Sequence, residues 1–445
     1  MEDIPASVPS GDETSQEAKQ AGEARGRWPW TEPAVWTERM LAALEKGVKG
    51  GKWFSLMDKV YSYRNLWSAF QKVAANKGAA GVDHVTIEMF ERDVRTNLRQ
   101  LSEELREGTY RPHAVKRVWI PKPGGKELRP LGIPTVRDRV VQAALRNVLE
   151  PIFERDFAEH SYGFRPGRGC KDALRRVDEL LKAGYTRVVD ADLKAYFDTI
   201  SHRRLQKLLS EKVSDGRVLR LLEIFLEQGI LDGQEETIPE KGSPQGSVIS
   251  PLLSNVYLNP LDHWMTERGY EMVRYADDFV ILCRSREEAE AALEAIKEWT
   301  AQAELVLHPT KTRIVSERKD GVDFLGYRFR RGRRWPRDKS IQKLRATLRS
   351  KTKRSNGESL KAIIANVNKT LKGWFEYFKH SDRVTFPKQD KWVRVRLRSI
   401  LRKRYGGKGH GRGRDHWYYP IAFFTKQGLY SMTIAHALAR QSLTR

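Results

Sequence analysis

The chain has 445 residues and a formal net charge of +24 at pH 7. Its length predicts two or three domains, and its charge favours a polyanionic partner. Cys170 and Cys283 are its two cysteines, which excludes a disulfide framework or a cysteine zinc site and fits a reducing cytoplasm. No apolar run approaches the roughly 18 residues of a membrane span and no signal peptide is recognisable, so we expect a cytoplasmic protein without a membrane partner.

The N-terminal part is expected to be helical behind an acidic tail. Residues 1–27 are rich in Ser, Gly, Glu and Ala and have few large apolar side chains, so they are expected to stay disordered. Apolar residues at helical spacing predict a helical N-terminal extension over 28–112. Within it, glycines and alanines indicate a loop at 76–83, and a helix is expected over 86–107.

Mixed strands and helices are expected over 113–335. Alternating apolar residues predict a hairpin of strands 115–121 and 128–133 around a Pro-Gly-Gly turn. Further strands are expected at 186–192, on both sides of Asp277, at 313–317 and at 322–329, with helices at 136–155, 170–183, near 201–229, 250–267 and 285–303. This order predicts an α+β core. Helices without strands follow over 336–405, and then a basic segment over 406–445.

The positive charge is concentrated near the C-terminus. Between Arg328 and Arg414 the sequence holds 29 lysines and arginines and five acidic residues, which accounts for the entire formal net charge. Trp374, Tyr377 and Trp392 lie among these cations. Because aromatic rings beside guanidinium groups are typical of nucleic-acid-binding surfaces, this region is predicted to bind nucleic acid.

Two acidic strand ends carry the residues best suited to catalysis. Asp277 and Asp278 stand between two short apolar β-forming runs, as acids at a hairpin turn do. Asp190 and Asp192 end the predicted strand 186–192, and their spacing places both on one face of it. Three carboxylates from two strand ends suit a pair of Mg²⁺ ions in nucleotidyl transfer. Spacing alone leaves Asp190 and Asp192 as alternatives.

These strand ends resemble the catalytic motifs of reverse transcriptases. The sequence Asp-Leu-Lys-Ala-Tyr-Phe that begins at Asp192 is similar to the first motif, and the Tyr-Ala-Asp-Asp sequence is similar to the second. The resemblance implies that Asp192, Asp277 and Asp278 bind two Mg²⁺ ions, with the Leu193 carbonyl as an additional ligand. It also implies that Phe197 lies under the sugar 2′-position and excludes ribonucleotides.

Other motifs resemble those of group II intron reverse transcriptases in particular. The Pro-Lys-Pro-Gly-Gly hairpin resembles their fingers hairpin, which implies that Lys122 and Arg129 bind the incoming triphosphate. The segments 162–168 and 242–253 resemble the next two signatures of the family. The second of these implies that Gln245 lies near the nucleotide and the template.

The resemblance extends over most of the remaining chain. Lys311, in the sequence His-Pro-Thr-Lys-Thr, matches a lysine that protonates pyrophosphate. The Phe-Leu-Gly-Tyr sequence that ends at Tyr327 resembles the turn that steadies the primer end. The segment 373–378 resembles the thumb, also called the maturase domain, and the segment 78–83 resembles the N-terminal extension of bacterial intron-encoded enzymes.

The chain is therefore identified as a member of the group II intron reverse transcriptase/maturase family. Membership implies a right-hand polymerase of fingers and palm, with an N-terminal extension and an α-helical thumb. The expected partners are group II intron RNA, an RNA template with a DNA primer, and deoxynucleoside triphosphates, and the oligomeric state is left open. Nucleic-acid contacts are expected from Arg165, Arg168, Tyr327, Trp374, Arg394, Arg398 and Arg402.

Two other functions are compatible with the same motifs. One is a free-standing reverse transcriptase of this lineage that serves phage defence or DNA repair without a splicing role. The other is an RNA-binding maturase with an inactive polymerase, and the intact acidic set argues against it. The sequence after the thumb lacks the paired cysteines of a His-Asn-His endonuclease, which implies that the DNA primer comes from another source.

Overall fold

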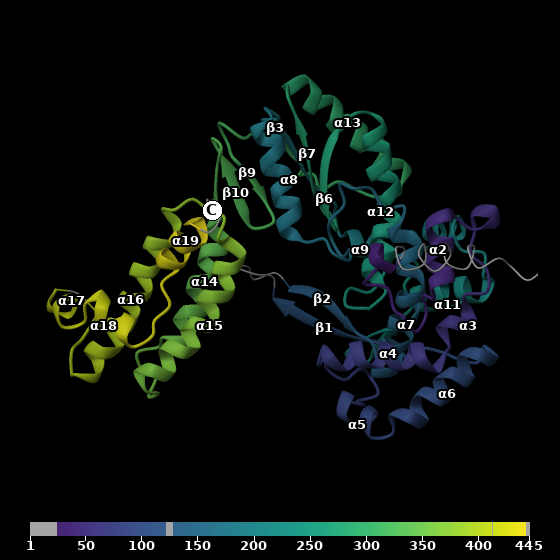
Figure 1. Cartoon of the computed structure of the whole chain (residues 1–445), viewed down its shortest axis with the longest axis horizontal. Coiled ribbons are helices and arrows are strands. Elements are labelled where there is room, and N and C mark those ends of the chain that lie inside the picture. Colours follow the sequence, from purple (N-terminus) through teal and green to yellow (C-terminus); the bar gives the residue numbers. More distant parts are fainter. Residues whose placement is uncertain (1–24, 122–127, 412, 442–445) are drawn as a thin grey trace, which may run out of the picture.

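The computed structural model describes residues 25–121, 128–411 and 413–441 (Figure 1). Figure 1 shows the C-terminal helices at one side of the molecule and the N-terminal helices at the other. The α+β architecture expected from the sequence is confirmed, with strands and helices mixed in the middle of the chain and helices alone following β11. Within these described ranges, no helix is both long enough and apolar enough to cross a membrane.

The N-terminal extension is helical, as expected. Residues 25–27, which the sequence placed in the disordered tail, are helical, and the Arg25 guanidinium donates a hydrogen bond to the Trp36 carbonyl (2.8 Å). Trp36 is fully buried, and its indole N–H bonds the Asn147 carbonyl (2.9 Å), which fixes the extension to the fingers. The helix expected over 86–107 is two helices separated at Asp93. The elements are α2 (Glu38–Lys46), the 3-10 helix η1 (Lys49–Gly51), α3 (Met57–Val60), α4 (Tyr63–Ala75), α5 (Ile87–Arg92) and α6 (Val94–Glu107).

The fingers region has a four-stranded sheet in the order β2-β1-β4-β5. The hairpin of β1 (Val115–Pro121) and β2 (Leu128–Ile133) has the predicted bounds. The sequence did not predict β4 (Ile230–Asp232), which pairs parallel with β1, or β5 (Glu235–Thr237). The long buried helix α7 (Val136–Glu154) packs against α4 and joins this region to the N-terminal extension.

The palm region is built on a second four-stranded sheet, in the order β6-β7-β3-β8. Its strands are β3 (Arg187–Asp192), β6 (Glu271–Tyr275), β7 (Asp278–Cys283) and β8 (Arg313–Ser316). The surrounding helices are α8 (Cys170–Lys182), α9 (Tyr196–Thr199), α10 (His202–Ser210), α11 (Gly216–Leu226), α12 (Ser250–Glu267) and α13 (Arg286–Gln302). The region expected as helix near 201–229 is thus the pair α10 and α11.

Both faces of the palm sheet are buried, because successive side chains of a strand point to opposite faces. Val188 of β3 joins the cluster of α8 and the β9–β10 strands, whereas Val189 and Ala191 join the large cluster that contains α12 and α13. In β7, Val280 and Ile281 divide between the same two clusters. A strand covered on both faces is held rigidly, and β3 and β7 therefore give their terminal residues fixed positions.

A three-stranded sheet connects the palm to the C-terminal helices. It contains β9 (Val322–Phe324), β10 (Tyr327–Arg330) and β11 (Arg333–Pro336), of which β11 was not predicted. The helices are α14 (Asp338–Lys351), α15 (Leu360–Phe378), α16 (Thr385–Arg404), α17 (Arg414–Tyr418), α18 (Ile421–Lys426) and α19 (Met432–Gln441). They enclose a core of their own, which includes Leu371, Phe386 and Leu397.

Candidate active site

The strand register brings the predicted acids together. Asp192, the last residue of β3, lies directly opposite Asp278, the first residue of β7, and Asp277 is in the turn that connects β6 to β7. Asp190, the alternative, lies opposite Val280 and forms an ion pair with Arg313 (3.6 Å). Of the two strand acids, Asp192 is therefore the one paired with the acidic hairpin.

The turn from Tyr275 to Asp278, called here the acidic turn, has a strained backbone. Ala276 has a φ of +59°, a left-handed conformation that costs an alanine energy. Gly163, from the predicted signature 162–168, packs against this turn so closely that a Cβ atom there would collide with the Ala276 nitrogen. A glycine is therefore required at position 163 for the acidic turn to hold its place.

A buried ion-pair network supports the acidic turn from inside the palm. Arg274 is fully buried and binds both carboxylate oxygens of Asp262, through Nε (2.7 Å) and Nη2. Its Nη1 donates to the Asn255 side chain (3.0 Å) and to the carbonyl of Ala276 (2.9 Å). Asn255 in turn donates to the Gly163 carbonyl (2.8 Å). The guanidinium thus fixes the carbonyl of the residue immediately before Asp277.

The acidic site favours bound cations. Burial, with a further contribution from Asp192, raises the pKa of Asp277. Burial and the neighbouring carboxylates of Asp190 and Asp277 raise the pKa of Asp278 to about 7, although the side chain of Asp278 is solvent-exposed and water screens part of this repulsion. Divalent cations relieve such repulsion and prefer carboxylate oxygens. In the described ranges, no three acidic, His or Cys side chains already form a closed metal-ligand cluster.

Lys311 reaches the same site through a loop that holds the end of β3. Its Nζ lies 2.7 Å from the Asp192 carboxylate. The loop is fixed because the His308 N–H donates to the Asp192 carbonyl (2.7 Å). Leu193 forms a β-bridge with Leu307 next to this contact. The positions of Asp192, Leu193 and Lys311 therefore depend on one another.

The residues predicted to bind the nucleotide are only partly brought together. Phe197 and Gln245 line one cavity of about 190 Å³ beside β1 and β2. The Ser243 N–H donates to the Phe197 carbonyl (2.7 Å), which joins Phe197 to the segment that contains Gln245. The Gly132 N–H of β2 donates to the Gln245 carbonyl (2.6 Å), which joins that segment to the fingers sheet. Arg129 is exposed on β2. Lys122 lies outside the described residues.

Two of the predicted nucleic-acid contacts have protein partners instead, and the prediction for them is corrected. Arg165 is buried, and its five N–H groups are all used by Glu154 and by backbone carbonyls. Arg398 is buried as well, donates to the Tyr419 carbonyl (2.9 Å) and lies over the Phe424 ring. Arg165 has no donor left for a phosphate, and burial keeps the Arg398 guanidinium away from solvent, so both side chains stabilise the fold.

The other predicted contacts lie nearer to solvent or support the turn 324–327. Tyr327 is buried, and its hydroxyl donates to the Tyr377 carbonyl (2.6 Å). It therefore holds the turn 324–327 and is not available for contact with a nucleic acid. Arg168 donates to the Glu159 carbonyl (2.5 Å). Trp374, Arg394 and Arg402 are half-buried in the thumb, where Trp374 packs on Phe378 and Arg402 binds Asp415 (2.8 Å).

Sequence reasoning missed three residues next to the acidic turn. Arg274 is a charged residue inside an apolar strand run, and this was the signal that could have identified it. Phe164 is 42% exposed, has a φ of +59° and lies 6.5 Å from the Tyr275 ring. Arg337 begins the thumb, and its charge is one of the influences that lower the pKa of Asp278. Only tertiary structure places Arg337 there.

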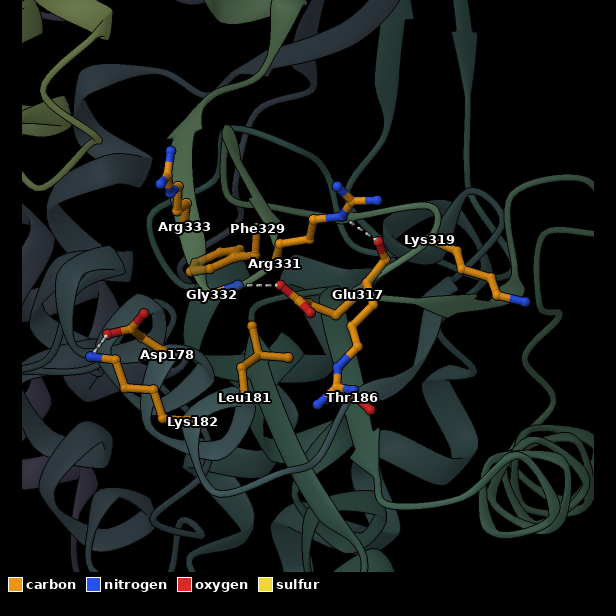
Figure 2. A pocket seen from close by; sticks show the side chains of 11 residues that line it. Asp178, Leu181, Lys182, Thr186, Glu317, Lys319, Phe329, Arg331, Gly332 and Arg333 are labelled. Carbon is orange, nitrogen blue, oxygen red and sulfur yellow. Dashed lines mark hydrogen bonds and ion pairs between the residues drawn. The ribbon is translucent and has the colours of Figure 1, made fainter.

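A larger cavity, of about 610 Å³, lies between the end of α8, the end of β8 and the β10–β11 turn (Figure 2). Glu317 accepts a hydrogen bond from the Gly332 N–H (2.8 Å) across it, and Lys182 pairs with Asp178 (2.7 Å) at its rim. The cavity contains none of the predicted site residues. This cavity is therefore not the candidate active site, although it is larger than the cavity beside Phe197.

Comparisons with known proteins agree with this geometry. Residues 120–329 match the family described as "Reverse transcriptase (RNA-dependent DNA polymerase)", and residues 341–419 match the "Group II intron, maturase-specific domain". The first match contains Asp192 and the acidic turn. The second covers most of the C-terminal helices.

Individual relatives give the same result. Protein YkfC of Escherichia coli (strain K12) is 35% identical over 350 residues, which are 69% of this chain and 86% of YkfC. The group II intron-encoded protein LtrA of Lactococcus lactis subsp. cremoris is 37% identical over 237 residues, which are 51% of this chain but 39% of LtrA. A chain of the partial Cas6-RT-Cas1–Cas2 complex matches 56% of this chain and 41% of its own length at 24% identity, with a TM-score of 0.36, which is too low to support an argument.

The two domain matches stand in the order expected from the sequence, and together they span the palm carboxylates and the helical C-terminal region. The chain belongs to the group II intron reverse transcriptase/maturase family.

Proposed function

We propose that this protein copies RNA into DNA by two-metal nucleotidyl transfer at Asp192, Asp277 and Asp278. The observation that carries the proposal is the register of β3 and β7, in which Asp192 faces Asp278 across one strand pair with Asp277 in the adjoining turn. Three acids from two rigid strand ends are the arrangement that phosphoryl transfer to a hydroxyl requires.

The site fits a pair of Mg²⁺ ions, because burial and the neighbouring carboxylates raise the pKa values of Asp277 and Asp278, and bound cations would offset both effects. Asp192, Asp277 and Asp278 would hold the ions, with the Leu193 carbonyl as a further ligand. When bound, the ions supply charge neutralisation at the primer hydroxyl and at the leaving pyrophosphate. Lys311, which pairs with Asp192, holds a proton that it can give to the pyrophosphate.

Phe197 and Gln245 select the substrate in this proposal. Their shared cavity borders the fingers sheet, so an incoming sugar that enters beside Phe197 meets an aromatic ring at its 2′-position. Lys122 and Arg129 bind the triphosphate from the fingers hairpin, since two cations on a glycine-turned hairpin suit phosphate oxygens.

The maturase half of the proposal assigns intron RNA to the helical C-terminal region. Residues 28–112 act as the N-terminal extension, 113–335 as fingers and palm, 336–405 as thumb and 406–445 as a nucleic-acid-binding segment. The group II intron maturase match and the excess of positive charge from Arg328 to Arg414 support this assignment. In this role the protein assists splicing and retromobility of its intron.

The substitution Asp277→Asn tests the polymerase assignment. It removes a metal-binding charge and keeps the shape of the turn, so primer extension on an RNA template in Mg²⁺ should fall below about one hundredth of wild type while RNA affinity stays nearly unchanged. Asp190→Asn is the matched control and should retain more activity, because Asp190 forms an ion pair with Arg313 and influences Asp278 only through its charge. Extension by Asp277→Asn above a tenth of the wild-type rate would contradict the assignment.

A further inference from the structure

The N-terminal extension contains a groove that the polymerase site does not use. It has a volume of about 970 Å³ and lies between α4, α6 and the segment 32–34. Small-molecule sites occupy roughly 300–1,000 Å³, so the groove is large enough for an extended ligand. In Figure 1, α4 and α6 lie at the opposite end of the molecule from the β6–β7 hairpin. A ligand here would not compete with the palm.

One wall of the groove presents two aromatic rings. Tyr63 and Trp67 stand one turn apart on α4, where residues four apart share a face. Their rings are stacked, 6.4 Å apart with planes 25° from parallel, and they are 37% and 36% exposed. Trp67 also lies 6.4 Å from the Phe70 ring, which is buried and holds it from behind. The result is a fixed and solvent-facing aromatic platform.

The other wall presents a row of arginines. Arg95, Arg99 and Arg106 lie on one face of α6, because spacings of four and eleven residues return to the same side of a helix. They span roughly 16 Å along the helix at 1.5 Å per residue. Arg64 adds a fourth guanidinium from α4.

These four arginines have unused donors. All four are exposed, and across the described residues none of their guanidinium groups makes a hydrogen bond or an ion pair. Other arginines of the same region are paired, as Arg27 is with Glu45 and Arg137 is with Glu104. Two acids also line the groove: Glu32, which Lys72 neutralises (3.0 Å), and Glu103, so the four guanidinium groups outnumber the remaining carboxylate. The groove therefore keeps a net positive charge for a ligand from outside the chain.

We propose that this groove binds a single-stranded polynucleotide. Bases would stack on Tyr63 and Trp67, and the backbone phosphates would follow Arg95, Arg99 and Arg106 along α6. Rings beside a row of cations form the arrangement that binds single strands without sequence preference. An acidic peptide would use the cations but leave the exposed rings without a partner, which is why a nucleic acid is the better occupant.

The test titrates a fluorescent single strand onto the full-length protein whose palm is already filled. The palm is occupied by an RNA template with a dideoxy-terminated DNA primer and the next nucleotide. The probes are rU12 and dT12, which distinguish RNA from DNA. Binding of either should be detected, and Tyr63→Ala with Trp67→Ala should weaken it about tenfold or more through weaker stacking. Arg95→Gln, Arg99→Gln and Arg106→Gln together should flatten the slope of log K against log salt by about 2.

Matched controls keep the result specific. Phe54→Ala removes a 62% exposed ring elsewhere in the extension, and Arg39→Gln with Arg92→Gln removes two exposed cations outside the groove. These controls should leave probe binding unchanged, and all variants should remain folded at the assay temperature and keep the wild-type rate of primer extension. The proposal is overturned if the filled protein binds neither probe, or if the groove variants bind as the controls do. Because primer extension is measured in parallel, a failure here is distinguishable from a failure of the polymerase assignment.

Discussion

Arg274 and Asp262 form a fully buried ion pair whose remaining donor fixes the Ala276 carbonyl. Arg274→Lys keeps the positive charge but removes the guanidinium group that binds both oxygens of Asp262 and the Ala276 carbonyl. The acidic turn should therefore lose these hydrogen bonds. We expect a loss of stability of roughly 3 kcal/mol, as for a broken buried pair. We also expect a higher Mg²⁺ concentration for half-maximal primer extension, with little change in template–primer affinity.

Arg165→Lys is the matched control for this substitution. Arg165 is buried as well and binds Glu154 through Nε and Nη2, but none of its hydrogen bonds reaches the acidic turn. It should lose comparable stability and keep the wild-type Mg²⁺ dependence. If both variants shift the Mg²⁺ dependence equally, Arg274 has only a general structural role.

Phe197 gives a second prediction at the scale of single residues. Phe197→Ala removes the ring that we propose meets the sugar, and it should lower the preference for deoxynucleotides over ribonucleotides by about tenfold, which corresponds to relieving a steric cost of roughly 1–3 kcal/mol. The measurement is the ratio of incorporation efficiencies for dATP and ATP on one template. An unchanged ratio would identify Phe197 as a packing residue.

At this scale the sequence predicted the acids better than the cations. Asp277 and Asp278 could be placed because the hairpin fixes where its turn lies, whereas spacing left Asp190 and Asp192 as alternatives and the resemblance to reverse transcriptases selected Asp192. The exposure of Arg165 and Arg398 could not be predicted, because each is buried by a partner that the chain brings from 11 or 21 residues away. Charge in a sequence indicates a phosphate contact only when no carboxylate or carbonyl in the fold takes the donors first.

Among the helices and strands, the local sequence predicted those elements in which apolar residues recur at regular helix or strand spacing. The bounds of β1, β2 and α12 agree with the predicted ones. The short strands β4 and β5 have no such signal, and β4 exists because β1 is available as a parallel partner more than 100 residues earlier in the chain. Pairing over that distance depends on the tertiary structure, so it cannot be predicted from a short stretch of the sequence.

Helix α19 provides a prediction about pH. His436 on this helix is buried against the Phe386 ring (4.8 Å), and burial lowers the pKa of His436 below its usual value of about 6.5. A histidine with a lowered pKa contributes stability above pH 6.5, and this contribution is lost as the pH falls through the folded-state pKa. The unfolding midpoint of the thumb should therefore fall from pH 7.5 to pH 5.

The substitution His436→Phe should make that fall smaller, because a phenyl ring packs on Phe386 without titrating. Some acid sensitivity should persist, since burial also lowers the pKa of His380. Hydrogen exchange of α19 at the two pH values locates the effect. Equal acid sensitivity in the variant and the wild type would show that His436 stays neutral or is not buried in solution.

On the scale of the whole molecule, the charge of the C-terminal region should govern RNA affinity. Lys388, Lys391 and Lys403 are exposed on α16. Replacing all three with glutamine should reduce the slope of log K against log salt for intron RNA by about 2, or roughly 0.7 for each phosphate that is no longer neutralised. Arg398→Gln should instead destabilise the thumb and leave the slope nearly unchanged, because that side chain is buried. An equal slope in the wild type and the lysine variant would exclude α16 from the RNA interface.

The turn 324–327 is held by hydrogen bonds to the thumb, while its buried side chains pack in the palm core. The Tyr377 hydroxyl donates to the Leu325 carbonyl (2.7 Å), and the Gly326 carbonyl accepts from the Arg337 N–H (2.9 Å) and from the Ser340 hydroxyl (3.1 Å). A rotation of the thumb must carry this turn with it. In a polymerase that steadies its primer at this turn, we expect strand release and translocation to be one movement, and the number of nucleotides added before dissociation to depend on these hydrogen bonds.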